Sequence, residues 1–261
     1  MHYAICTVAA APVRKEPSHR TEMTNQLLFG ETMEVLEMND EWLRVQSLYD
    51  GYEGWLTHHL VTEIEKAIAI ADPHYVATAL INPVTLPNQL LNAPMGSILT
   101  GFDEDKGSLW TEQYSYHGSY RNVKRPFDLD LFWKTTQAWI NAPYLWGGKT
   151  FMGVDCSGFV QTVFKLQGIR LQRDAWQQAA QGAVVQNLGE TKTGDVAFFD
   201  NEKGKVIHVG IILSSNEIIH SSGKVRIDKI DQTGIINSDL GKRTHQLHSI
   251  KRMAVLNEVS N

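Results

Sequence analysis

The sequence predicts a protein of the α+β class, in which small all-β modules precede a mixed domain. Short apolar runs separated by turn residues fill the first part of the chain. A weaker version of the same plan follows it. From Asp128 onward helical periodicity comes first and alternating strands come after it, which is typical of an α+β domain. We therefore expect three units, at residues 1–65, 66–125 and 126–261.

The composition is that of a globular protein and argues against two classes of partner. Apolar residues make up 43% of the 261 residues, charged residues make up 20%, and the formal net charge is −5. This mild charge gives no electrostatic attraction to nucleic acid or anionic lipid. The basic residues between Lys242 and Arg252 are interpreted as the solvated side of a strand. No stretch approaches the ~18 apolar residues that cross a membrane, so we expect neither nucleic acid nor membrane as a partner.

The start of the sequence lacks the pattern of an export signal. Met1 is not followed by a basic segment and a long apolar run. If Met1 is the native start, we expect a cytoplasmic protein. If a signal has been removed, we expect the periplasm or the cell wall instead.

The first unit is predicted to be a small β-barrel. Strands are expected at residues 32–36, 42–47 and 54–57, with turns between them. Residues 66–125 repeat this plan weakly, because the leucine pairs at 27–28 and 90–91 recur at the same spacing as Leu36 and Leu99.

Three helices and four strands are predicted in the last unit. Asp128 caps a helix that Pro143 ends, because the residue before a proline avoids helical angles. A second helix follows Asp155 and ends near Gly168. A third begins at Asp174, with a glutamine at the reciprocal capping position. Strands are expected at residues 195–199, 206–213, 217–220 and 225–230.

Cys156 is the first candidate for chemistry. It follows the predicted cap Asp155, so its sulfur lies at the first turn of a helix, where the dipole favours a thiolate. The carboxylate of Asp155 opposes this effect, so a nearby imidazole is needed as well. A buried structural cysteine is the simpler interpretation, but the glycines at 147–148 and the small residues after Cys156 favour catalysis. The other cysteine, Cys6, allows at most one disulfide and forms no zinc pattern with it.

Two of the ten histidines lie on predicted strands of the same unit as Cys156. A short turn at residues 214–216 joins these strands, so an antiparallel hairpin places His208 and His220 opposite or diagonal to each other. Two histidines satisfied on a sheet face would be the simpler interpretation without the cysteine. Together with Cys156, the two histidines complete a set of three roles: a nucleophile, a base and an orienting group. His245 and His248 are expected on the surface.

These residues resemble the NlpC-type cell-wall peptidases, a circularly permuted papain-like family. The resemblance covers roughly residues 126–261 and rests on four motifs in the family's order. They are at residues 143–148 (Pro-Tyr-Leu-Trp-Gly-Gly), 155–159 (Asp-Cys-Ser-Gly-Phe), 208–211 (His-Val-Gly-Ile) and 219–223 (Ile-His-Ser-Ser-Gly). Residues 14–18 and 50–55 are similar to the bacterial SH3-like modules of the subgroup that acts on γ-D-glutamyl-L-diamino acid bonds. That subgroup has two such modules.

The resemblance implies two small SH3-like barrels before a papain-like catalytic domain. It implies an endopeptidase that hydrolyses γ-D-glutamyl-L-diamino acid bonds of murein peptides, in peptidoglycan recycling. Cys156 would attack the carbonyl, His208 would take up and return the proton, and His220 would orient His208. Tyr144 would help to hold the oxyanion.

The resemblance also implies which residues contact the substrate. Asp155 and Ser157 flank the nucleophile. In the subgroup the first module closes one end of the cleft, so only peptides with a free N-terminal L-Ala fit. Glu16, Tyr52 and Asp155 are the candidates to bind that ammonium group, with Glu22 as an alternative to Glu16.

Trp176 departs from the family pattern and leaves the diamino acid preference open. It stands where a substrate-binding serine is expected, so it either reshapes a subsite or packs against the cleft wall. A non-catalytic wall-binding protein and an acyltransferase with the same thiol remain alternatives. No phosphate-binding glycine loop or zinc pattern is present in the sequence, so neither nucleotide nor metal is expected as a cofactor. The sequence does not indicate the oligomeric state.

Overall fold

The computed structural model describes residues 2–111 and 113–253 and combines helices and strands with a small N-terminal barrel. The barrel is a seven-stranded sheet in the order β3-β2-β6-β5-β4-β1-β7. Its strands are β1 (Tyr3–Cys6), β2 (Ala10–Arg14), β3 (Met23–Leu28), β4 (Thr32–Met38), β5 (Trp42–Ser47), β6 (Glu53–Thr57) and β7 (Val61–Glu63). The three strands predicted from the sequence correspond to β4, β5 and β6. The fold therefore begins as an all-β unit around its own apolar core.

The next segment forms two small sheets rather than one continuous sheet. After the short helix α1 (Lys66–Ala69), a three-stranded sheet has the order β10-β9-β11 and a two-stranded sheet pairs β12 with β8. The strands are β8 (Tyr75–Ala77), β9 (Ile81–Leu86), β10 (Gln89–Pro94), β11 (Ser115–Tyr116) and β12 (Tyr120–Asn122). These sheets share a core with Phe29 of the barrel, so the two β units pack together.

Three helices follow, and their caps are those expected. They are α2 (Leu129–Ala138), α3 (Cys156–Lys165) and α4 (Ala175–Gln178). Asp128 accepts a hydrogen bond from the N–H of Leu131 at 2.9 Å, and α4 begins with a capping box. The predicted role of Pro143 was wrong. Helix α2 ends earlier, and Asn141 reverses the chain with a left-handed φ of 69°.

The C-terminal sheet has the order β15-β21-β16-β17-β18-β19-β20, and an extra pairing of β20 with β21 closes six of its strands into a ring. The strands are β15 (Ala183–Val185), β16 (Val196–Asp200), β17 (Val206–Ser214), β18 (Glu217–Ser222), β19 (Lys224–Asp231), β20 (Gly234–Asn237) and β21 (Lys242–Arg252). The basic stretch is strand β21, as predicted.

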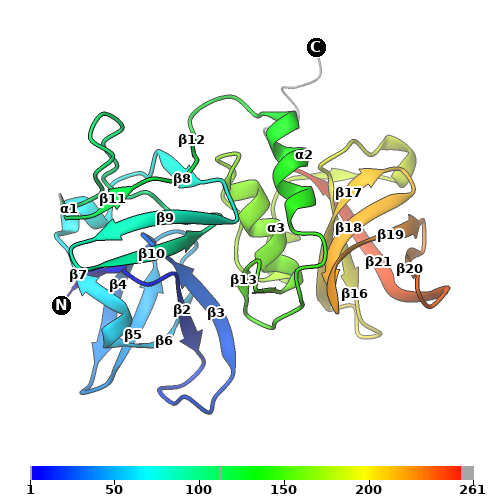
Figure 1. Ribbon diagram of the computed structural model, residues 1–261. Helices are drawn as coiled ribbons and strands as arrows, with labels where there is room; N and C mark the ends of the chain where they lie inside the picture. Colours follow the sequence, from blue (N-terminus) through cyan, green and yellow to red (C-terminus); the bar gives the residue numbers. More distant parts are fainter. Residues whose placement is uncertain (1, 112, 254–261) are drawn as a thin grey trace.

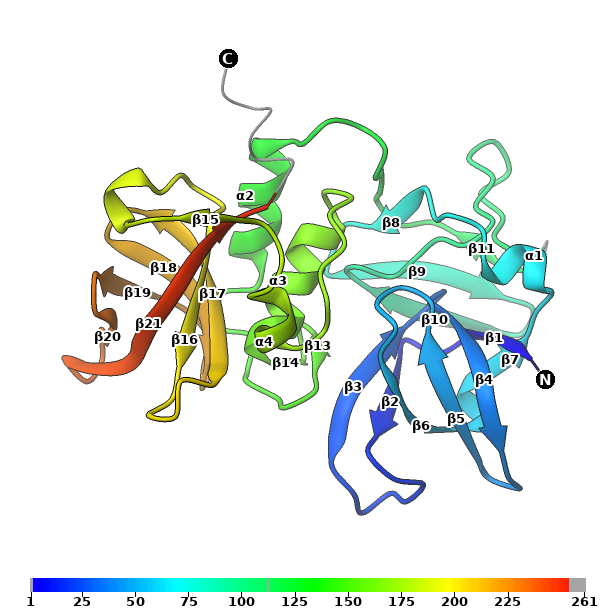
Figure 2. The same cartoon turned by 180° about the vertical axis from the view of Figure 1, so that it is seen from behind.

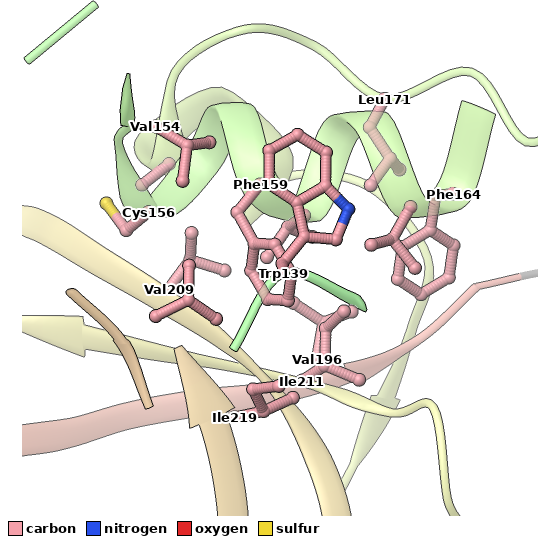
Figure 3. Packing of buried hydrophobic residues seen from close by; sticks show 14 of the residues in the cluster. Trp139, Val154, Cys156, Phe159, Phe164, Leu171, Val196, Val209, Ile211 and Ile219 are labelled. Atoms are coloured by element: carbon pink, nitrogen blue, oxygen red, sulfur yellow. The ribbon is translucent and has the colours of Figure 1, made fainter. Parts of the chain in front are cut away.

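Helix α3 lies between the β units and this sheet. All ten of its residues are buried, and it packs against β17 and β18. Figure 3 shows Cys156 at the edge of the apolar cluster, where α3 begins, with Val209 of β17 nearby. Figure 2 shows α4 and the short strand β13 (Lys149–Thr150) in the middle of the molecule, beside β3 of the barrel. The start of α3 is therefore close to both the sheet and the barrel.

A buried ionic cluster joins the barrel to the helices. Glu31 of the barrel is fully buried and pairs with Lys149 at 3.1 Å and with Lys165 of α3. Burial alone would raise the pKa of Glu31, but the two ammonium groups lower it to about 2. The carboxylate therefore stays ionised, and removal of either lysine would leave a poorly compensated buried charge.

Candidate active site

Cys156 is the first residue of α3, and the elements around it hold it firmly. Asp155 is the N-cap and accepts from the N–H of Gly158 at 2.7 Å. A Cβ on Gly158 would lie 2.4 Å from the backbone oxygen of Gly148, so the glycines permit close backbone packing rather than open space. The hydroxyl of Ser221 donates to the backbone oxygen of Val154 at 2.8 Å. This bond ties the segment before the cysteine to strand β18.

Burial of Cys156 favours the thiol over the thiolate that the helix position suggested. Burial raises the pKa of Cys156 to about 12, and the carboxylate of Asp155 raises it further. Hydrogen bonds from the amides of Val209 and Ser157 lower the pKa but do not cancel this rise. Burial also lowers the pKa of His208 well below its usual range, with help from His220 and His245. Both shifts favour the neutral forms of the thiol and the imidazole, and a neutral imidazole can serve as a general base.

His208 and His220 meet as the hairpin predicts. In the β17–β18 pairing His220 lies opposite Gly210, which places it diagonal to His208. The Nε2 atom of His208 is 2.8 Å from the Nδ1 atom of His220, and both side chains are buried. A Cβ on Gly210 would lie 2.8 Å from the Cβ of His220, so glycine is required beside the pair.

The surface prediction for His245 was wrong. Its ring stacks on that of His208, with 4.1 Å between centroids and 27° between planes. Burial lowers the pKa of His245 to about 4, so it is neutral as well. Strand β21 therefore covers the ring of the candidate base and limits its contact with water.

A cleft of about 470 Å³ opens beside the thiol, and two parts of the chain line it. We call Tyr144, Cys156 and Ser157 of the lining, together with the buried His208 and His220 on the strands that pack against α3, the catalytic wall. We call Glu22, Thr24 and Tyr52 of the barrel the barrel wall. The remaining lining residues are Trp146, Asp155, Asp174, Ala175, Trp176, Lys205, Val206 and Ile207. The volume fits a short peptide.

Asp155 lines the cleft, but its carboxylate is already engaged. Both oxygens pair with the buried guanidinium of Arg173, at 3.0 and 2.5 Å. The same carboxylate accepts from the N–H groups of Gly147 and Gly158 at 2.8 and 2.7 Å. Arg173 also donates to the hydroxyl of Ser157 at 2.9 Å. The predicted ammonium-binding role of Asp155 therefore competes with a complete set of partners, whereas Ser157 lies beside the thiol as expected.

Glu16 does not reach the cleft. It lies in the exposed turn between β2 and β3, and the side chain that lines the cleft is that of Glu22. The Oε1 atom of Glu22 accepts from the indole N–H of Trp146 at 2.7 Å. Tyr52 lines the cleft as predicted, and the carboxylate of Asp174 contributes to the raised pKa of Tyr52 after burial. Glu22 and Tyr52 of the barrel wall and Asp174 at the start of α4 therefore bring two carboxyl groups and a hydroxyl to the cleft.

The remaining predicted residues lie on the walls of the cleft. Tyr144 is half-buried, and burial together with the neighbouring thiol raises its pKa, so it keeps its O–H as a donor. Trp176 is 54% exposed and donates to Asp174 at 3.3 Å. Among the lining residues in the described part of the chain, only Lys205 is cationic. The cleft thus carries acidic groups together with one free ammonium group.

Several residues of the site were missed in the sequence. Asp174 was assigned only as a helix cap, although it follows the arginine that pairs with Asp155. Lys205 directly precedes the strand that carries His208, and Asp228 accepts from His220 at 3.1 Å. Each lies close in sequence to a predicted residue, but no spacing rule indicates its contacts. No group of histidine, cysteine, aspartate or glutamate suited to a metal occurs within residues 2–111 and 113–253, and none of the described helices is long and apolar enough to span a membrane.

Comparison with known proteins agrees with this geometry. Residues 141–244 match the NlpC/P60 family, and residues 13–59 match the bacterial dipeptidyl-peptidase SH3 domain. A probable endopeptidase NlpC homolog of Haemophilus influenzae is 38% identical over 166 residues, which cover 61% of this chain and 85% of that protein. The chain belongs to the NlpC/P60 family.

Other members of the NlpC/P60 family match over most of the chain. A gamma-D-glutamyl-L-lysine dipeptidyl-peptidase of Bacillus cereus is 26% identical, over 87% of this chain and 77% of that protein. The dipeptidyl-peptidase 6 of Lysinibacillus sphaericus is 26% identical, over 88% of this chain and 92% of that protein. The crystal structure of an NlpC/P60 family protein from Bacillus cereus has a TM-score of 0.78 and 20% identity, and covers 96% of this chain and 99% of that one. The barrel and the catalytic unit thus occur together in full-length relatives.

Proposed function

We propose that the protein is a cysteine peptidase that hydrolyses the γ-D-glutamyl-L-diamino acid bond of murein peptides with a free N-terminal L-Ala. The observation that carries this proposal is the buried His208–His220 pair on strands of the catalytic unit, where Val206 and Ile207 of β17 line the same cleft as Cys156 and the barrel lines its other side. The names of two relatives, a gamma-D-glutamyl-L-lysine dipeptidyl-peptidase and a dipeptidyl-peptidase, support the same reaction class.

The proposed reaction starts from the neutral thiol of Cys156 and the neutral imidazole of His208. His208 accepts the thiol proton as the sulfur of Cys156 attacks the scissile carbonyl carbon, and it then gives that proton to the leaving amine. We assign the developing oxyanion to the O–H of Tyr144, which lines the cleft, and to the N–H groups at the start of α3. Water then hydrolyses the thioester and releases the dipeptide.

The charges of the cleft support a substrate with both an amine and a carboxylate. Glu22, Asp174 and the hydroxyl of Tyr52 offer acceptors to the ammonium group of L-Ala. Lys205 offers a cation to a carboxylate of the peptide, such as that of D-Glu. Because the barrel occupies one side of the cleft, we assign the enzyme to the trimming of short free peptides in peptidoglycan recycling.

Two finer features of the fold belong to this proposal. We interpret the catalytic unit as a circularly permuted papain-like domain, on the basis of its resemblance to the NlpC-type peptidases. We interpret residues 66–125 as a second SH3-like module, on the basis of the weak internal repeat.

The test is hydrolysis of defined tripeptides. The protein is incubated with L-Ala-γ-D-Glu-meso-diaminopimelate and with L-Ala-γ-D-Glu-L-Lys, and products are identified by mass spectrometry. We expect release of L-Ala-D-Glu from at least one tripeptide by the wild type and none by Cys156→Ala. Absence of release from both, or equal release by the variant, would show that the proposal is wrong.

A further inference from the structure

A buried carboxylate lies behind the histidine pair and has no role in the reaction described so far. Asp228 lies on β19 opposite Ile218 of β18, which places it diagonal to His220 on the same face of the sheet. Its side chain is fully buried, and so is that of His220. A row of polar side chains therefore crosses three neighbouring strands, from His208 on β17 through His220 on β18 to Asp228 on β19.

The contacts of Asp228 show that it is ionised. Its Oδ1 atom accepts from the guanidinium of Arg226 at 3.0 Å and from the backbone N–H of Ser238 at 2.9 Å. Its Oδ2 atom lies 3.1 Å from the Nε2 atom of His220. Burial would raise the pKa of Asp228, but the hydrogen bonds from His220, Ser238 and Arg226 lower it below its usual range. A carboxylate without a proton can only accept, so His220 must donate through Nε2.

In a pair of neutral imidazoles, this donation fixes the protonation of both rings. A neutral imidazole with a proton on Nε2 presents an unprotonated Nδ1, so the Nδ1 of His220 accepts from its neighbour. The neighbouring atom is the Nε2 of His208, at 2.8 Å, which must therefore carry the proton. The Nδ1 of His208 is left with a free lone pair. Of the four ring nitrogens of His208 and His220, it alone can still accept a proton as a base.

We propose that Asp228 is a positioning residue of the active site, which sets the tautomers of His220 and His208 so that His208 presents an unprotonated Nδ1 to the thiol of Cys156. This inference rests on the proposed function for the identity of the reaction. It does not rest on it for the tautomers, which are a property of the protein without substrate.

The same chain of bonds stabilises the charge that forms during the reaction. When the bond from sulfur to the carbonyl carbon forms, the thiol proton moves to Nδ1 of His208 and the carbonyl electron pair moves to oxygen. His208 is then an imidazolium, whose Nε2–H points at His220, which in turn donates to the carboxylate of Asp228. Because the thiol and the imidazole start neutral, the positive charge of His208 appears only during the reaction. The buried carboxylate of Asp228, two hydrogen bonds away, stabilises that charge. Breakage of the C–N bond returns the proton to the leaving amine.

A purely structural role for Asp228 is the alternative, since it also pairs with Arg226. The groups that face Asp228 are His220 from β18, Arg226 from its own strand and the amide of Ser238 after β20, and its charge also acts on His245 of β21. Arg226 makes a second ion pair with the exposed Asp239, at 2.7 Å. A structural role would change stability and leave the pH dependence of catalysis unmoved.

The matched variants are Asp228→Asn and Asp239→Asn, which each remove one carboxylate from Arg226. We expect Asp228→Asn to lower kcat by about 10- to 100-fold with KM unchanged within about twofold. Loss of the anion disfavours the imidazolium, so the acid limb of the kcat profile should move to lower pH. Asp239→Asn should match the wild type in kcat and in profile. A wild-type kcat and acid limb in a folded Asp228→Asn variant would overturn the proposal.

A second measurement needs neither a variant that folds nor a substrate. Long-range ¹H–¹⁵N spectra of the wild-type imidazoles at pH 7 report which ring nitrogen carries the proton. We expect both His208 and His220 to be protonated at Nε2 only. A proton on Nδ1 of either ring would overturn the proposal, and this outcome is independent of whether the tripeptides are hydrolysed.

Discussion

The two walls of the cleft differ in how they are built. In the catalytic wall, Cys156 and Ser157 lie on α3 and the two histidines lie on the neighbouring strands β17 and β18, and these four side chains are buried and held within one unit. Tyr144 precedes α3 and is half-buried. The groups of the barrel wall are more exposed and reach the cleft because the barrel is docked through Glu31, Lys149 and Lys165. The first arrangement suits bond breaking and the second suits recognition. Changes to the catalytic wall should therefore lower kcat, and changes to the barrel wall should raise KM.

The largest effect is expected from a comparison of the two free cysteines. Cys156→Ser should lower kcat for the tripeptide by about 10⁴-fold or more, because a serine hydroxyl is a much poorer nucleophile beside a weak base. Cys6→Ser is the matched control, since Cys6 is also buried, with a pKa that burial raises to about 12, but lies in the barrel core. Product release is followed by mass spectrometry. Similar losses in both variants would contradict the assignment of the nucleophile.

The docking of the barrel predicts the next effect. Lys149→Met leaves Glu31 with one ammonium partner, so the free energy of unfolding should fall by about 3–5 kcal/mol. It is measured by chemical denaturation, with Lys134→Met on the exposed face of α2 as control. Replacing both Lys149 and Glu31 by apolar residues should restore much of the loss. Equal stability of the two single variants would show that the ionic cluster does not hold the barrel.

Recognition of the amine predicts an effect on KM. Glu22→Gln removes a charge from the barrel wall while its oxygen can still accept from Trp146, so KM should rise about tenfold or more, with kcat nearly unchanged. Glu16→Gln removes a charge from the exposed turn and should have no effect. Initial rates over a range of tripeptide concentrations measure both constants. A larger rise in KM for Glu16→Gln than for Glu22→Gln would show that Glu16 binds the amine.

The smallest effect is expected at Lys205. Because this side chain is exposed, Lys205→Met should raise KM only about two- to fivefold for a peptide with D-Glu. With D-isoglutamine in place of D-Glu, the wild type and the variant should have the same KM, since the carboxylate is gone. Lys203→Met, two residues away and outside the cleft, is the control. An equal loss with both peptides would contradict a carboxylate contact.

The sequence predicts the elements that follow local rules. The cap Asp155, the capping box at Asp174 and the hairpin of His208 and His220 are confirmed because capping and alternation depend on neighbouring residues. The strands β1, β2, β3, β7 and β20 were not predicted. Strands β1 and β7 are only four and three residues long, and β1 pairs with β4 and β7 across long stretches of chain.

The parts of the site that could not be predicted come from long-range contacts. His245 stacks on His208 because β21 returns along β16, and Asp228 meets His220 because β19 pairs in one particular register. Glu22, the named alternative to Glu16 in the same connection between β2 and β3, is the one that lines the cleft. The pKa of Cys156 depends on burial and on Asp155, which together outweigh the helix start. None of these contacts follows from sequence spacing.

The catalytic wall is proposed to cut a peptide whose free N-terminal ammonium group is bound at the barrel wall. The most direct test is kcat/KM of the wild type for L-Ala-γ-D-Glu-L-Lys against the same peptide with an acetylated N-terminus. We expect the acetylated peptide to be hydrolysed about 100-fold more slowly or worse, because it lacks the ammonium group that the acidic barrel wall binds. Equal kcat/KM for the two peptides would contradict the account.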